Sequence, residues 1–114
     1  MTVDEMKKIS DWISKQEGCP YPVSNQRVLC GFVTADYDKW LNFLDIHHDE
    51  IALRLRKQEV CLQNGEQWVL IDPVNHSRGF RFYKAKIDKD IDYNTMRVCI
   101  LPQMACYCCE VEWI

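Results

Sequence analysis

A chain of 114 residues has room for one domain with its own core, but not for a cofactor domain joined to a substrate domain. Hydrophobic residues make up 47% of it and charged residues 27%, as in ordinary globular proteins, and no stretch approaches the roughly 20 consecutive apolar residues of a membrane span. The formal net charge of −3 leaves no basic excess for non-specific binding to duplex DNA. We therefore expect a single soluble domain over residues 1–114, without a membrane partner.

The amino terminus and the cysteines bear on the cellular compartment. "MTVDEMKKISDWISKQEG" has neither the apolar core nor the small-residue cleavage site of a secretory signal, which predicts a cytoplasmic protein. The seven cysteines are an odd number, and thiols stay reduced in the cytoplasm. We expect free thiols, most of them buried as small hydrophobic side chains.

The first predicted helix spans residues 3–17. Thr2 and Glu5 have the spacing of a capping box, and apolar residues recur at helical spacing until Gly18 ends the run. After a loop, the apolar residues 27–33 predict a buried strand.

A second helix is predicted to begin at Thr34, which is a suitable capping residue. Asp36 and Asp38 follow where the helix dipole favours negative charge, and an apolar stripe reaches His47 and His48. The next residues, 51–57, fit both a strand and a continued helix, so periodicity leaves their structure open.

The second half of the chain is rich in strand signals. Asn64-Gly65 joins two β-prone runs and predicts a hairpin with a type I′ turn. Residues 80–87, "MRVCILP" (96–102) and "ACYCCEVEWI" (105–114) are interpreted as further strands. Together these patterns predict an α+β fold in which two helices pack on an antiparallel sheet of about five strands.

The segment "RGFRFYKA", residues 78–85, resembles the RNP1 motif of RNA-recognition domains, in which alternating aromatic rings stack on bases. The residues that fit the motif are Arg78, Gly79, Phe80 and Phe82. Three residues depart from it: Arg81 stands in place of a small residue, Tyr83 in place of an aliphatic one and Ala85 in place of the last ring. The resemblance implies a module that binds single-stranded nucleic acid, which we keep as an alternative function.

A second resemblance covers about a quarter of the chain. The Asn64-Gly65 hairpin, the loop that starts at Arg78 and the aliphatic strand ending at Asp88 are together similar to a middle segment of phage terminase ATPases. In those enzymes carboxylates at the end of the strand hold Mg²⁺. This chain has no "GxxxxGK[ST]" phosphate loop, and Lys89 stands in the place of the second carboxylate. The resemblance therefore implies a small phage accessory protein without ATPase activity.

Metal and catalytic chemistry have weaker signals. Cys106 and Cys108 share one face of a predicted strand, so Cys61, Cys99 or His76 would have to complete a zinc tetrahedron. The spacing favours buried thiols, and a zinc-stabilised interaction module stays a further alternative. No local signature selects a nucleophile, so we assign no catalytic residue, no metal ligand and no cofactor.

These observations favour a small non-catalytic protein of phage or mobile-element type that binds a host macromolecule in the host cytoplasm. Its most concrete form is an anti-CRISPR or related anti-defence inhibitor, whose partner is a host protein or a protein–nucleic-acid complex. Strand alternation puts Ala85 and Ile87 toward the core, while Trp12, Trp40 and Trp68 are expected to be buried. The predicted binding residues are Arg78, Phe80, Phe82, Lys84, Lys86 and Trp113.

Overall fold

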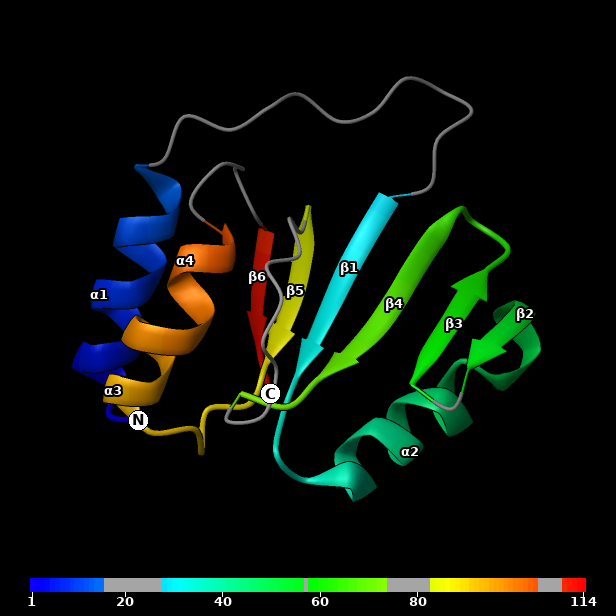
Figure 1. Cartoon of the computed structure of the whole chain (residues 1–114), viewed down its shortest axis with the longest axis horizontal. Helices are drawn as coiled ribbons and strands as arrows, with labels where there is room; N and C mark the ends of the chain where they lie inside the picture. The colour runs from blue at the N-terminus through cyan, green and yellow to red at the C-terminus, as the bar shows by residue number, and fades with distance from the viewer. Residues whose placement is uncertain (16–27, 57, 74–82, 105–109) are drawn as a thin grey trace.

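A computed structural model describes residues 1–15, 28–56, 58–73, 83–104 and 110–114 (Figure 1). The helices are α1 (Val3–Ser14), α2 (Tyr37–Ile46), α3 (Tyr93–Thr95) and α4 (Leu101–Met104), with a 3-10 turn at His48–Glu50 and a π-helical turn at Met96–Ile100. The strands are β1 (Val28–Val33), β2 (Ile51–Arg56), β3 (Glu59–Leu62), β4 (Glu66–Ile71), β5 (Lys84–Ile87) and β6 (Glu110–Trp113). They form one sheet in the order β2-β3-β4-β1-β5-β6, which confirms the α+β class.

The sheet is mixed and has six strands among the described residues, where an antiparallel sheet of about five was expected. β1 runs parallel to β4 and β5, and β5 runs parallel to β6, whereas β3 is antiparallel to β2 and β4. Side-chain alternation carries no information on strand direction, so the sequence pattern could not distinguish these arrangements. The sixth strand is β2, which settles residues 51–56 as a strand.

The prediction of a strand at residues 96–102 is wrong, because this segment is helical. Asp92 caps its start through a side-chain hydrogen bond. The N–H of Leu101 donates to the carbonyl of Met96, which gives a π-helical turn directly before Pro102. Proline lacks an N–H and clashes with the carbonyl four residues back, and the wider turn accommodates it. The helical segment also supplies the crossover that parallel neighbours such as β5 and β6 require.

Both predicted helices are present. The capping box of α1 is confirmed, with bonds of 2.9 and 3.1 Å between Thr2 and Glu5. The cap of α2 is Asp36 rather than Thr34. Thr34 has another role, because its hydroxyl accepts a hydrogen bond from the Asp36 N–H and donates one to Asp88.

The predicted β3–β4 hairpin is present, but its turn is not type I′. A type I′ turn needs two residues with positive φ. Among the described residues, Gly65 alone has a positive φ, of 91°. The Gly65 N–H donates to the carbonyl of Leu62, so the loop contains three residues. Asn64 instead accepts a hydrogen bond from the Glu66 N–H through its side chain.

Two cores lie on opposite faces of the sheet. One includes Ile9 and Ile13 of α1, and the other includes Trp40 of α2 and Trp68 of β4. The expected burial of these two tryptophans is confirmed, but Trp12 is 36% exposed. It directly precedes Ile13, and adjacent side chains on a helix diverge by about 100°.

The helices on the two faces are offset from each other. Figure 1 shows α1, α3 and α4 together at the β5–β6 end of the sheet, whereas α2 lies toward the β2–β3 end. On the α2 face, the side chains of β5 and β6 are charged: the lysines of β5 are partly buried and the glutamates of β6 are exposed. No helix among the described residues covers that part of the sheet.

Candidate functional site

Strand β5 presents its two lysines on the partly open face. Ala85 and Ile87 are buried in the α1-side core, as the alternation predicts, and Lys84 and Lys86 alternate with them. The other predicted binding residues of this segment, Arg78, Phe80 and Phe82, lie outside the described residues.

Lys84 is held by a carboxylate of the neighbouring hairpin. Its ammonium lies 2.8 Å from Glu66, and this hydrogen bond raises the pKa of Lys84. Burial alone would raise the pKa of Glu66, but hydrogen bonds involving Lys84, Asn64 and Trp68 hold it below its usual value. The charge of Lys84 is therefore balanced by that of Glu66, and Lys84 adds no free positive charge to this surface.

Lys86 covers an aromatic floor. Its ammonium lies 2.5 Å from Glu112 of β6, and 6.0 and 5.9 Å from the ring centres of Phe43 and Trp68. At these distances a cation is attracted to the negative faces of the rings. The aromatic pair already accommodates one cationic group.

Two adjoining hollows of about 340 and 530 Å³ together form what we call the trough, between α2 and strands β5–β6. They share Phe43, His47, Lys86 and Glu112. Five carboxylates and three lysines line the trough: Asp38, Glu50, Glu66, Glu110, Glu112, Lys39, Lys84 and Lys86. Phe43 and Trp68, which are 5% and 4% exposed, form its floor, and its rim has an excess of negative charge.

Trp113 lies away from the trough. It pairs with Ile87 across β5–β6 and packs against the α1-side core, half-buried. Its indole N–H donates to the Ser10 hydroxyl at 3.1 Å. The structure thus brings together Lys84 and Lys86 of the predicted binding residues, but places Trp113 on the opposite face.

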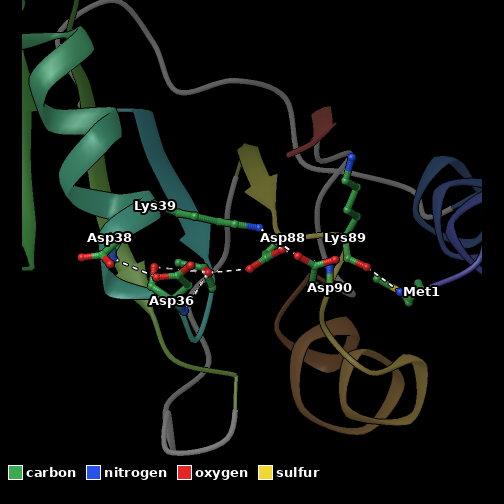
Figure 2. A network of polar contacts seen from close by, with 8 residues as sticks. Met1, Asp36, Asp38, Lys39, Asp88, Lys89 and Asp90 are labelled. Atoms are coloured by element: carbon green, nitrogen blue, oxygen red, sulfur yellow. Dashed lines mark hydrogen bonds and ion pairs between the residues drawn. The ribbon is translucent and has the colours of Figure 1, made fainter.

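A second polar site lies at the carboxyl ends of β1 and β5 (Figure 2). Asp88 follows β5 and is 4% exposed. It accepts hydrogen bonds from the Lys39 ammonium and the Thr34 hydroxyl, both at 2.7 Å, and from the Asp90 N–H at 2.9 Å. Burial would raise the pKa of Asp88, but these bonds together keep it below its usual value, and the bond to Asp88 raises the pKa of Lys39.

Asp88 lies in a crevice between two adjacent parallel strands, β1 and β5. The helices that follow these strands, α2 and α3, lie on opposite faces of the sheet, and open α/β sheets bind ligands at such a point. Here the Lys39 ammonium lies within 2.7 Å of Asp88 and 3.2 Å of Asp90. Within the described ranges, no group of three or more histidines, cysteines or acidic residues is arranged to hold a metal. Because the Lys39 ammonium lies against both carboxylates, we interpret the crevice as an internal ion pair. The sequence did not indicate Lys39, because it lies 49 residues from Asp88.

Of the cysteines that the structure describes, Cys30 and Cys61 are buried and Cys99 is half-buried. Cys106 and Cys108, on which the zinc alternative depends, lie outside the described residues. The end of the second helix, which periodicity left open, is at Ile46; His47 is its C-cap, and the His47 Nδ1 lies 3.1 Å from a carboxylate oxygen of Glu50.

No protein-family model, curated protein or solved structure matches this chain. The RNP1-like and terminase-like resemblances thus remain predictions from the sequence. None of the described helices has the length and apolar character needed to cross a bilayer.

Proposed function

We propose that this chain is a non-catalytic binding protein that docks another macromolecule in the trough. The observation that carries the proposal is the combination of an aromatic floor, formed by Phe43 of α2 and Trp68 of β4, with a densely charged rim. The β5–β6 side of this rim lies on a part of the sheet that no described helix covers. Aromatic side chains at the centre of a polar rim are typical of protein interfaces.

The charge of the rim supports a protein partner over nucleic acid. Lys84 and Lys86 are each paired with a carboxylate, and carboxylates outnumber lysines around the trough. Phosphate binding needs an excess of cations, and carboxylates at the rim repel the nucleic-acid backbone. Basic segments of a protein partner complement this rim.

A phage or mobile-element inhibitor of host defence, such as an anti-CRISPR protein, is the most specific form of this proposal. It is supported by the terminase-like resemblance alone. Expression in a bacterial strain whose CRISPR–Cas system targets a plasmid should then raise transformation by that plasmid at least about tenfold. Unchanged transformation across strains with different effector types would refute this form and leave the broader proposal standing.

The trough itself is tested with the double variant Glu110→Gln/Glu112→Gln, which removes two charges from the edge strand β6. The matched control is Asp11→Asn/Asp45→Asn, which removes two exposed charges from α1 and α2 outside the trough. Immobilised wild type and variants are incubated with bacterial lysate, with and without nuclease, and the affinity of each captured protein is then measured.

We expect capture to survive nuclease, the trough variant to bind at least about tenfold more weakly and the control to bind as wild type does. Capture that is lost with nuclease would support the nucleic-acid alternative. Equal binding by all three proteins would exclude the trough as the docking surface.

A further inference from the structure

A separate groove of about 260 Å³ lies on the other face of the sheet, between α1 and the helical segment α3–α4. Figure 1 shows these helices side by side. Ile9 and Leu101 are 1% and 6% exposed and form its floor, while Trp12, Tyr93 and Pro102 line its sides. No residue of this groove belongs to the trough.

Both helices place a basic residue one turn from an aromatic one. Lys8 and Trp12 are four residues apart on α1, and Tyr93 and Arg97 are four residues apart on the facing segment. Arg97 donates a hydrogen bond to Asn94 at 3.4 Å. Within the described part of the chain, neither Lys8 nor Arg97 forms an ion pair with a carboxylate, whereas Lys39, Lys84 and Lys86 all do.

We propose that this groove binds a small aromatic anion, a molecule of one to three aromatic rings that carries a carboxylate or sulfonate. The rings would pack between Trp12 and Tyr93 over the apolar floor, which suits the offset and edge-on contacts of aromatic groups. The acid group would pair with Lys8 and Arg97, since guanidinium and ammonium groups form strong hydrogen bonds with such anions. The volume is slightly below the roughly 300–1,000 Å³ of sites for drug-sized ligands, so a small ligand fits it.

Two fluorescent probes that differ in charge separate the contributions of the rings and of the acid. The anionic probe is 8-anilinonaphthalene-1-sulfonate, and the neutral probe is N-phenyl-1-naphthylamine, which lacks the sulfonate. Each is titrated into the native full-length protein, with a melting curve recorded for every variant.

We expect the wild type to bind about one anionic probe per chain. Lys8→Gln/Arg97→Gln should weaken binding of the anionic probe about tenfold and binding of the neutral probe less than about twofold, because only the anionic probe loses ion pairs. Trp12→Ala should weaken the binding of both probes. The control Lys7→Gln/Arg54→Gln removes two exposed cations outside the groove and should leave both affinities unchanged.

The proposal is overturned if the anionic probe shows no saturable binding at concentrations up to about 1 mM. A dissociation constant of that size corresponds to a binding free energy of only about 4 kcal/mol. It is equally overturned if the control variant weakens this probe as much as the Lys8/Arg97 variant does. The trough variant Glu110→Gln/Glu112→Gln should bind both probes as the wild type does. A negative result for the groove therefore says nothing against the proposed function of the trough.

Discussion

Replacing Lys39 by methionine removes the ammonium that faces the buried carboxylate of Asp88. The two groups are 2.7 Å apart, and the Asp88 side chain is 6% exposed while that of Lys39 is 30% exposed. In the variant, Asp88 keeps the Thr34 hydroxyl and the Asp90 N–H but loses its counter-charge. We expect Lys39→Met to destabilise the protein without changing its fold.

The magnitude follows from the burial of the two partners. Breaking a fully buried ion pair costs about 3–5 kcal/mol, and a hydrogen bond to a charged group contributes about 1.5–3 kcal/mol. Because the Lys39 ammonium is partly exposed, water weakens the pair. We therefore expect the free energy of unfolding at pH 7 to fall by about 2 kcal/mol, or the Tm by about 10 °C.

Urea denaturation of wild type and variant across pH provides the assay. The folded-state pKa of Asp88 is below its usual value. The charged form therefore contributes its whole stabilisation above the unfolded-state pKa of about 4, and this contribution is lost as pH falls through the folded-state pKa. The pKa of Lys39 is raised, so the pair also weakens as pH rises through that pKa, above 10.5. The difference between the two proteins should thus be largest at neutral pH and shrink below about pH 4.

Lys89→Met is the matched control, because Lys89 is the exposed neighbour of Asp88. Its backbone carbonyl accepts a hydrogen bond from the amino group of Met1 (Figure 2), and its backbone N–H donates one to the carbonyl of Ile114. It should change the free energy of unfolding by less than about 0.5 kcal/mol. If Lys39→Met cost no more than this control, or if its cost stayed constant from pH 7 to pH 3, the assigned ion pair would be refuted.

Three further measurements address other parts of the fold. Gly65→Ala should destabilise by about 1–2 kcal/mol, since φ of 91° strains any other residue although the space around the glycine is open; a neutral result in thermal melts would contradict this turn geometry. Trp40→Ala should cost about 3–5 kcal/mol because Trp40 is fully buried, whereas Trp12→Ala should cost far less, and a reversed order in denaturation midpoints would refute the assignment of the cores. Thiol titration of the denatured protein without reductant should give close to the seven cysteines of the sequence, and a count near one would indicate three disulfides.

Local chemistry in the sequence determined several elements of this fold. The capping box of α1, the three-residue loop ending at Gly65 and the alternation of β5 each depend on residues a few positions apart, so short-range rules predicted the elements, though not the turn type. The apolar run at 96–102 misled the same rules, because strand and helix can both bury such a run and the crossover to β6 selects the helix.

The candidate functional surfaces depend on contacts between distant segments. Lys84 and Lys86 could be placed on one face of β5 from alternation, but not their pairing with Glu66 and Glu112, which changes the surface from a basic strand to a trough with an acidic rim. Likewise, the Asp88–Lys39 pair exists only because β5 lies beside β1 in parallel. The sequence determines which side chains carry charge and to which face they point, whereas strand order decides which charges meet, because Coulomb and hydrogen-bond energies depend on distance in space and not along the chain.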